Sequence, residues 1–154
     1  MVKKQTIIGV IGGHTCNAKV EQLAHELGRN IAKVEAILVC GGLSGVMKAV
    51  AKGVKSAGGI TIGIIPGEDK AEANPYIDIV IPTGLGLARN TLVVRTADVI
   101  IALPGEYGTL SEIAFALVLK KKVIDLGNWD ISGTIKVDSA EEAIKYIKEE
   151  IQSK

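Results

Sequence analysis

Short runs of aliphatic residues alternate with amphipathic segments along the whole chain. Each run is nearly continuous, rich in isoleucine and valine, and ends at glycine, proline or a polar turn. Such runs predict buried strands, which here cover residues 6–11, 36–40, 60–65, 77–81, 99–103 and 123–126. Strands that are buried on both faces and separated by helices are typical of a parallel sheet.

The segments between these runs have the periodicity of helices. In the first of them, apolar residues share one helical face at Val20, Leu23, Ala24 and Leu27, and Gly28 is expected to help end the helix. Helices are predicted over residues 17–29, 45–57, 85–96 and 108–121, with a closing helix capped at Asp138-Ser139. We therefore predict one Rossmann-like α/β domain over residues 1–154, with a parallel sheet and helices on both faces.

The predicted helix over residues 108–121 is apolar on nearly every side. A helix of this kind is covered on more than one side, either within the domain or by a partner subunit. We therefore expect a homodimer or a higher homo-oligomer that associates through its apolar helices.

Glycine-rich turns follow three of the predicted strands, at residues 12–13, 41–45 and 104–109. The carboxyl ends of parallel strands lie at one edge of a sheet, so the turns are expected to converge on one ligand-binding mouth. The turn at 104–109 leads directly into a helix, whose free N–H groups and positive dipole end favour an anionic group. The candidate ligand- or phosphate-binding residues are Gly12, Gly13, Gly41, Gly42, Ser44, Gly45, Gly105, Glu106, Tyr107, Gly108 and Thr109.

Two charged residues near this mouth are candidates for chemistry. Glu112 follows Gly108 by one helical turn, and it is either an acid that complements the helix dipole or a group that acts on the ligand. Arg89 is one of only three arginines and falls in helical register with apolar residues. Its guanidinium either reaches water or holds a phosphate or carboxylate. Asn90 beside it is either a second polar contact or exposed to solvent.

Two other residues have alternative interpretations. His14 follows the first glycine turn and either faces the ligand or is simply polar. Trp129 lies in the loop over residues 127–133 and is compatible with a lid or a subunit contact.

The charge balance argues against several partner classes. The chain has 18 lysines and arginines against 17 aspartates and glutamates, with no basic run and few aromatic residues. Nucleic acid and membrane surfaces are therefore not expected as partners, and a small molecule is favoured. No uninterrupted apolar stretch is long enough to span a membrane, and the N-terminal segment lacks the features of a signal peptide.

Cys16 and Cys40 are the only cysteines, and no zinc-ligand spacing is present, so we expect reduced thiols in a cytoplasmic protein without a metal site. A dinucleotide site of the usual kind is disfavoured as well. The first turn is not GxGxxG, and the second strand ends in Cys40 instead of an acid. We therefore expect no cofactor.

Two motifs together resemble a known family. The turn at 41–47 is similar to a GGxxGxM motif, and residues 104–112 are similar to the PGGxGTxxE motif of the cytokinin-activating LOG proteins. These are Rossmann-like proteins, often labelled "lysine decarboxylase", and the resemblance extends from residue 6 to about residue 126. It implies an N-glycosidase that releases the base from a nucleoside 5′-monophosphate. The turn at 105–109 would hold the phosphate, and Glu112 and Arg89 would be the catalytic residues.

The chain departs from the LOG pattern at two positions, because Glu106 replaces the second glycine of the motif and Asn90 replaces a lysine. Both changes make the site less favourable to a phosphomonoester. A shorter branch of the same superfamily resembles molybdenum-cofactor carrier proteins, which bind a phosphorylated pterin without turnover. The sequence therefore predicts a protein that binds a nucleotide-like ligand, first as a phosphoribohydrolase and alternatively as a carrier or sensor.

Overall fold

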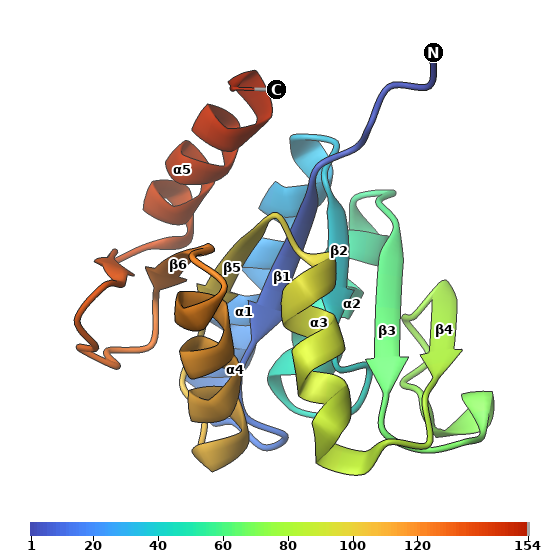
Figure 1. The fold of residues 1–154 in the computed structure, drawn as a ribbon. Coiled ribbons are helices and arrows are strands. Elements are labelled where there is room, and N and C mark those ends of the chain that lie inside the picture. Colours follow the sequence, from blue (N-terminus) through green and yellow to red (C-terminus); the bar gives the residue numbers. More distant parts are fainter. Residues whose placement is uncertain (154) are drawn as a thin grey trace.

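A seven-stranded parallel sheet forms the centre of the computed structural model, which describes residues 1–153 (Figure 1). The strands lie in the order β4-β3-β2-β1-β5-β6-β7, and every neighbouring pair is parallel. They are β1 (Ile7–Ile11), β2 (Ile37–Cys40), β3 (Thr61–Ile65), β4 (Ile79–Pro82), β5 (Val99–Ala102), β6 (Lys122–Asp125) and β7 (Ile135–Lys136). The predicted Rossmann-like α/β fold is confirmed.

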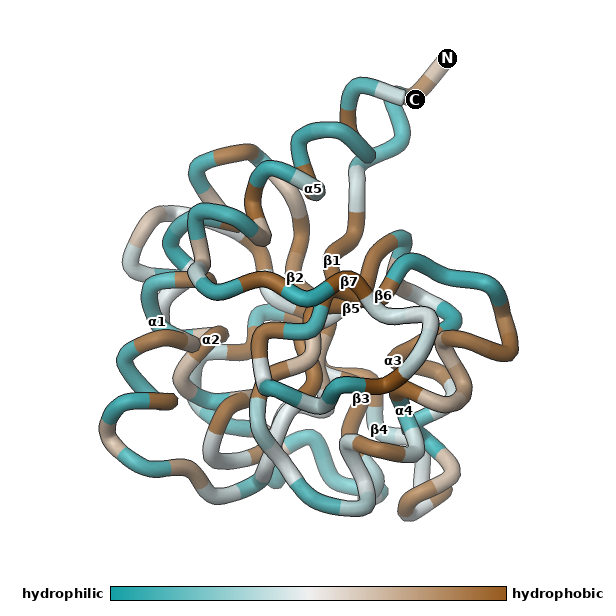
Figure 2. Tube along the Cα trace, turned by 90° about the vertical axis from the view of Figure 1, so that its left-hand side faces the viewer, coloured by the Kyte–Doolittle hydropathy of each residue, from teal (hydrophilic) through white to brown (hydrophobic). Residues whose placement is uncertain are grey.

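Helices cover both faces of the sheet and make three layers (Figure 2). They are α1 (Ala18–Lys33), α2 (Val46–Ser56), α3 (Asn90–Thr96), α4 (Tyr107–Val118) and α5 (Ala140–Gln152), with short 3-10 helices η1 (Lys70–Glu72) and η2 (Gly86–Arg89). α1, α2 and α5 form one apolar core with the sheet, while α3 and α4 form a second core on the opposite face. Within residues 1–153, no helix combines the length and apolar character needed to cross a membrane.

The order of the strands reverses next to β1. The chain builds outward from β1 to β4 and then returns to add β5 on the other side of β1. Ligands of open α/β sheets bind beyond the carboxyl ends of the strands at such a reversal. The fold therefore places the turns after β1 and β5 beside each other at the expected position of a site.

α1 is longer than the sequence predicted. The helix does not end near Gly28 but continues to Lys33, because Ile31 extends its buried stripe. Gly28 has a packing role instead, since a Cβ there would lie 2.2 Å from the carbonyl oxygen of Val50 in α2. Gly53 of α2 faces α1 in the same way, with His25 O only 2.0 Å from the position of its missing Cβ. The two glycines allow the helices to cross in close contact.

The predicted helix over residues 85–96 is divided into η2 and α3. Gly84 and Gly86 have φ angles of +64° and +59°, which are incompatible with a regular α-helix. A true α-helix therefore begins only at Asn90.

The loop after β6 leads to β7, a strand that the sequence pattern did not predict. The buried carboxylate of Asp125 accepts hydrogen bonds from the backbone N–H groups of Gly127, Trp129 and Asp130. The indole Nε1 of Trp129 donates to the carbonyl oxygen of Leu103 at 2.9 Å, and its ring packs against the core under α3 and α4. Trp129 therefore anchors this loop to the domain and is not free to act as a lid.

Replacing Gly28 with alanine should destabilise the fold, because the new Cβ meets backbone atoms of α2 that have no freedom to move aside. Overpacking of this kind costs about 1–3 kcal/mol. The matched control is Gly108→Ala, a helical glycine whose added Cβ would lie 3.9 Å from its nearest neighbour. Urea unfolding should show a lower midpoint for Gly28→Ala alone, and equal midpoints for the two variants would contradict the close helix crossing.

Candidate ligand-binding site

The glycine turns are joined to one another by backbone hydrogen bonds. Gly13 donates its N–H to the carbonyl oxygen of Pro104 at 2.9 Å and accepts a bond from the N–H of Val46 at 3.0 Å. The hydroxyl of Ser44 donates to the carbonyl oxygen of His14 at 2.8 Å. These bonds connect the turn after β1 to the turn after β5 and to the turn before α2, so the turns meet at one edge of the sheet.

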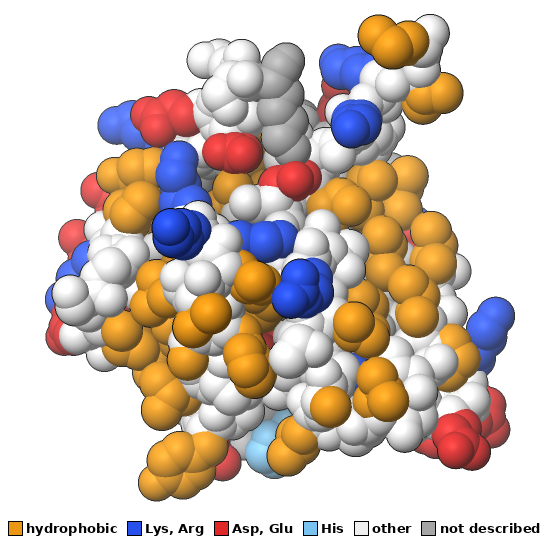
Figure 3. Space-filling model, viewed as in Figure 1, with side chains coloured by type: hydrophobic (Ala, Val, Ile, Leu, Met, Phe, Trp, Pro, Cys, Tyr) orange, Lys and Arg blue, Asp and Glu red, His pale blue; other side chains and the backbone are white. Residues whose placement is uncertain are grey.

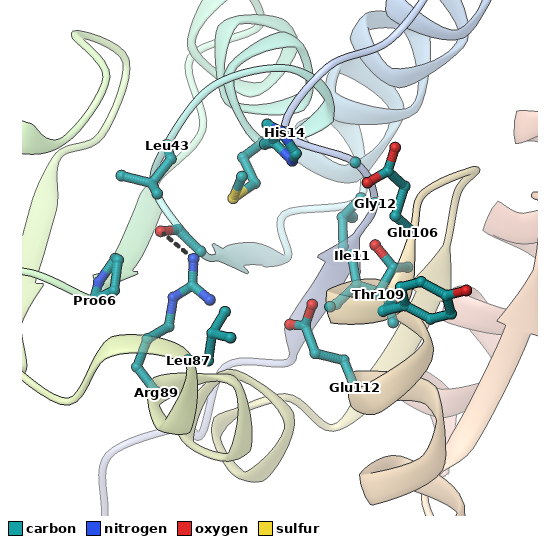
Figure 4. Close-up of a pocket in the computed structure, with 16 residues that line it drawn as sticks. Ile11, Gly12, His14, Leu43, Pro66, Leu87, Arg89, Glu106, Thr109 and Glu112 are labelled. Atoms are coloured by element: carbon teal, nitrogen blue, oxygen red, sulfur yellow. Dashed lines mark hydrogen bonds between the residues drawn. The ribbon is translucent and has the colours of Figure 1, made fainter.

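A pocket of about 340 Å³ lies at this edge, at the carboxyl ends of β1, β2 and β5 (Figure 4). Its volume is within the range of small-molecule sites. One side of its wall is apolar and consists of Leu43, Met47, Pro66 and Leu87. The remaining lining is more polar, with His14, Glu106 and Thr109 among its side chains and Arg89 and Glu112 toward its floor.

Most of the predicted site residues line this pocket. They are Gly12, Gly13, Gly41, Arg89, Glu106, Tyr107, Gly108, Thr109 and Glu112. The predicted residues that do not line it are Gly42, Ser44, Gly45 and Gly105. Two of these let the turns approach each other. A Cβ on Gly45, whose φ is +66°, would lie 2.4 Å from Gly13 O, and one on Gly105 would lie 2.8 Å from Gly13 N.

The N-terminus of α4 opens into the pocket. Glu106 precedes the helix in an extended conformation, and no side chain caps the first turn. The N–H groups of Tyr107, Gly108 and Thr109 have no acceptor within the helix, because the first helical bond is donated by Leu110. Together with the helix dipole, these N–H groups favour an anion such as a phosphate.

Glu112 is a buried carboxyl group without a direct partner. Its side chain lines the pocket, the residue is 8% exposed, and among residues 1–153 it makes no hydrogen bond or salt bridge. Burial raises the pKa of Glu112 to about 8, and the positive charge of Arg89 only partly opposes this rise. The group is therefore mainly protonated and neutral at pH 7.

Arg89 is buried and does not send its guanidinium to solvent. Nε donates to the carbonyl oxygen of Ile64 at 2.8 Å, Nη2 donates to that of Gly41 at 3.4 Å, and Nη1 donates to Oδ1 of Asn90. Burial lowers the pKa of Arg89, while the nearby carboxyl group of Glu112 acts in the opposite direction. These bonds fix a positive charge between the ends of β2 and β3, beside the pocket.

Asn90 connects this arginine to the first turn of α4. It is only 2% exposed, so the solvent-exposed alternative for its side chain is wrong. Oδ1 accepts from Arg89, and Nδ2 donates to Ser111 Oγ at 3.3 Å. The hydroxyl of Ser111 in turn donates to the carbonyl oxygen of Gly108 at 2.6 Å. Asn90, which replaces the lysine of the LOG motif, therefore links Arg89 to the first turn of α4 through hydrogen bonds.

Glu106 adds a negative charge at the rim of the pocket, where the LOG motif has a glycine. Its side chain is exposed and lines the pocket near the first glycine turn. Among residues 1–153, Arg89 is the only lysine or arginine in the pocket lining, while both Glu106 and Glu112 bring carboxyl groups. The pocket therefore relies on backbone N–H groups as well as on Arg89 to attract an anion.

The parallel sheet, the glycine turns at the ends of its strands and the open helix N-terminus define a Rossmann-like protein with a pocket at the carboxyl edge of the sheet. The chain belongs to the SLOG cluster4 family, whose model matches residues 5–153. The resemblance predicted from the two sequence motifs is confirmed.

Two curated relatives differ in how much of the chain they match. An uncharacterized protein of Archaeoglobus fulgidus is 41% identical over 140 residues, which cover 90% of this chain and 92% of that protein. A probable cytokinin riboside 5′-monophosphate phosphoribohydrolase of rice, Oryza sativa subsp. japonica, is 38% identical over 93 residues. That match covers 58% of this chain and 41% of the rice protein.

Two solved structures match nearly the whole chain. The molybdenum cofactor binding protein of the phototrophic bacterium Rippkaea orientalis has a TM-score of 0.90 and 36% identity, covering 97% of this chain and 99% of that one. The molybdenum cofactor carrier protein of Chlamydomonas reinhardtii has a TM-score of 0.87 and 36% identity, with the same coverage of both chains.

Replacing Glu112 with glutamine should remove a pH dependence of stability. The pKa is about 8 in the folded protein and near 4.5 in an exposed carboxyl group, so the folded state retains the proton more strongly. Stability therefore falls as the pH rises through this interval. Glutamine does not ionise, so between pH 4 and pH 9 wild type should lose about 4 to 5 kcal/mol relative to Glu112→Gln.

Urea unfolding of both proteins at pH 4, 7 and 9 measures this difference. Glu149→Gln on the exposed side of α5 is the control, and its difference from wild type should stay constant with pH. A difference between wild type and Glu112→Gln that is equally constant would contradict the raised pKa.

Proposed function

We propose that this protein binds a phosphorylated, pterin- or nucleotide-like ligand of the molybdenum-cofactor type and carries it without chemical change. The observation that supports this most strongly is a pocket with two unlike parts: the open N-terminus of α4 on one side and an apolar wall on the other. A ligand with a phosphate and a flat ring has the matching two parts. The near-complete structural match to proteins that bind or carry the molybdenum cofactor supports the same proposal.

The phosphate would lie against the N–H groups of Tyr107, Gly108 and Thr109, with Arg89 adding positive charge beside it. The ring would contact Leu43, Met47, Pro66 and Leu87, which bury apolar surface without contributing charge. The neutral carboxyl group of Glu112 would face the linker between ring and phosphate as a hydrogen-bond donor and acceptor. The residues present therefore fit this class of ligand.

The state of Glu112 favours carriage over hydrolysis. Cleavage of an N-glycosidic bond passes through an oxocarbenium-like state, which an ionised carboxylate stabilises and a neutral acid does not. A pKa of about 8 leaves few ionised carboxylates at pH 7.

A nucleoside 5′-monophosphate phosphoribohydrolase is the second candidate. It is favoured by the position of Glu112, a buried carboxyl group without a hydrogen-bond partner among residues 1–153 that lines the pocket together with Arg89. A bound substrate that brings positive charge toward Glu112 would lower its pKa and restore the carboxylate. The rice phosphoribohydrolase relative supports this alternative, although its match covers less than half of that enzyme.

We also expect the protein to be a cytoplasmic homo-oligomer that binds a small molecule and binds neither nucleic acid nor membrane. The cytoplasmic location rests on the two free cysteines, the partner classes rest on the balanced charge of the chain, and the homo-oligomer rests on its apolar helices.

The test of carriage is to purify the protein and to identify what it retains by mass spectrometry, alongside an assay of base release. We expect a retained phosphorylated pterin or nucleotide, and no free base from a panel of nucleoside 5′-monophosphates. Base release that disappears in Glu112→Gln would establish the hydrolase instead. A protein that retains nothing, binds none of the panel and releases no base would contradict both functions.

The hydroxyl of Thr109 gives a sharper test of the phosphate position. Thr109 is 4% exposed and lines the pocket in the first turn of α4. Thr109→Val keeps the shape but removes a hydrogen bond, so affinity for a phosphorylated ligand should fall about tenfold. Thr91→Val on α3, outside the pocket lining, is the matched control and should leave the affinity unchanged. Equal affinities for both variants in titration calorimetry would contradict a contact between this hydroxyl and the phosphate.

A further inference from the structure

Glu106 is a charged side chain without a partner at the mouth of the ligand pocket. It is exposed and lines the pocket, and within residues 1–153 its carboxylate makes no hydrogen bond or salt bridge. It directly precedes the free N–H groups at the start of α4, against which we place the phosphate. A phosphate bound there lies beside a like charge, which weakens its binding unless a cation lies between the two.

The side chains around the pocket do not supply that cation. Within residues 1–153, Arg89 is the only lysine or arginine of the lining, and Figure 4 shows it on the opposite side from Glu106. Its guanidinium is already bonded to two backbone carbonyl oxygens and to Asn90. The formal charges of Arg89 and Glu106 cancel, so a phosphate group, with a charge of about −1.5 to −2 at pH 7, meets no net positive charge from these side chains.

The surface at the carboxyl ends of the strands is poor in basic residues as well. Figure 3 shows apolar and acidic side chains and a histidine along the lower edge of this face, where the strands of Figure 1 end, and no lysine or arginine. The basic side chains of this face lie higher in the view. A phosphate at this edge therefore has no second side-chain cation to recruit on the visible face.

A second carboxyl group is directed into the same pocket. Glu112 is 8% exposed, lines the pocket and has no hydrogen-bond partner within residues 1–153. Figure 4 shows Glu106, Thr109 and Glu112 along one side of the pocket, facing the side that carries Arg89. Buried polar groups normally have a partner, so the partner of Glu112 is a molecule within the pocket. This side of the pocket therefore offers oxygen atoms to a bound group.

The space around Glu106 suits a hydrated cation. Its side chain lines the ligand pocket and also a neighbouring recess of about 210 Å³. His14, Cys16 and Asn17 line the recess too, and no lysine or arginine within residues 1–153 does. Mg²⁺ keeps several of its waters and is usually held by one or two carboxylates together with phosphate oxygens. The recess gives such waters room beside the carboxylate.

The chain does not hold a metal ion by its own side chains. Within residues 1–153, no three histidine, cysteine, aspartate or glutamate side chains are grouped so that they could bind one. A cation at Glu106 therefore needs oxygen atoms from the ligand. Carboxylate and phosphate oxygens suit Mg²⁺, Mn²⁺ and Ca²⁺, whereas thiolate and imidazole ligands suit Zn²⁺.

We propose that the pocket binds the phosphate group together with a divalent cation of the Mg²⁺ type, held between the carboxylate of Glu106 and the phosphate oxygens. Glu106 is then a metal ligand and not an obstacle to the phosphate. The cation makes the site positive toward the anion, while the N–H groups of Tyr107, Gly108 and Thr109 bind the remaining phosphate oxygens. This inference rests on the proposed ligand-binding function, because the phosphate supplies part of the cation site.

Guanosine 5′-monophosphate, whose ring resembles that of a pterin, tests the proposal in titration calorimetry with saturating magnesium chloride or with EDTA at equal ionic strength. Magnesium should tighten binding to wild type about tenfold, because it replaces a repulsion by two attractions. Glu106→Gln should lose this effect and, in EDTA, should bind the nucleotide more tightly than wild type does. A carboxylate with only a structural role would not produce these opposite changes.

Glu21→Gln is the matched control. Glu21 is an exposed acid in the first turn of α1 and lines neither the pocket nor the recess, so this variant should respond to magnesium as wild type does. Wild-type binding that is equal in magnesium and EDTA would overturn the cation site, as would a magnesium effect that persists in Glu106→Gln. Weaker binding by Glu106→Gln in EDTA would also overturn it, since the carboxylate would then contact the nucleotide directly.

Mn²⁺, which takes the same oxygen ligands, reports on the cation directly by electron paramagnetic resonance. The signal of free Mn²⁺ should fall further with wild type and the nucleotide together than with either alone, and Glu106→Gln should abolish this difference. Nucleotide binding without uptake of Mn²⁺ would overturn the cation site and leave the proposed function standing. Failure to bind the nucleotide or inorganic phosphate, with or without magnesium, would contradict the proposed function and the cation site with it.

Discussion

The architecture depends on one place where three backbone segments meet more closely than side chains would allow. Gly13 donates to Pro104 O and accepts from the N–H of Val46, which joins the turns after β1 and β5 to the start of α2. A Cβ on Gly45 would fall 2.4 Å from Gly13 O, and one on Gly105 would fall 2.8 Å from Gly13 N. Because backbone fills this space, the turns are held against one another, while the N–H groups of Tyr107, Gly108 and Thr109 at the start of α4 stay free beside the pocket.

Burial determines the charge states of Arg89 and Glu112 beside these turns. Arg89 satisfies its guanidinium with backbone carbonyl oxygens and Asn90, so it makes no salt bridge to Glu112. Desolvation of Glu112 therefore outweighs the attraction of the arginine, and the carboxyl group keeps its proton near neutral pH. We therefore propose that this pocket, with a fixed cation, free N–H groups and a neutral acid, holds an anion and does not generate a cationic intermediate.

The two faces of the sheet differ in how completely they are covered. α1, α2 and α5 close one face, whereas the short α3 leaves β4 bare on the other. The pocket opens onto this second face through Leu87 and Tyr107. The same lack of cover leaves part of the pocket wall, at Leu87 and Tyr107, exposed to solvent.

The sequence by itself determined the order of strands and helices, the parallel sheet and the position of the glycine turns. These features depend on residues close together along the chain, namely the aliphatic runs and the glycines that end them. Local signals did not reveal β7, the continuation of α1 past Gly28, or the apolar pocket wall. They also left open where the Arg89 guanidinium goes and did not indicate the raised pKa of Glu112. Each of these depends on which remote segments pack together, because burial and hydrogen-bond partners come from contacts between distant parts of the chain, and only the tertiary structure brings those parts into contact.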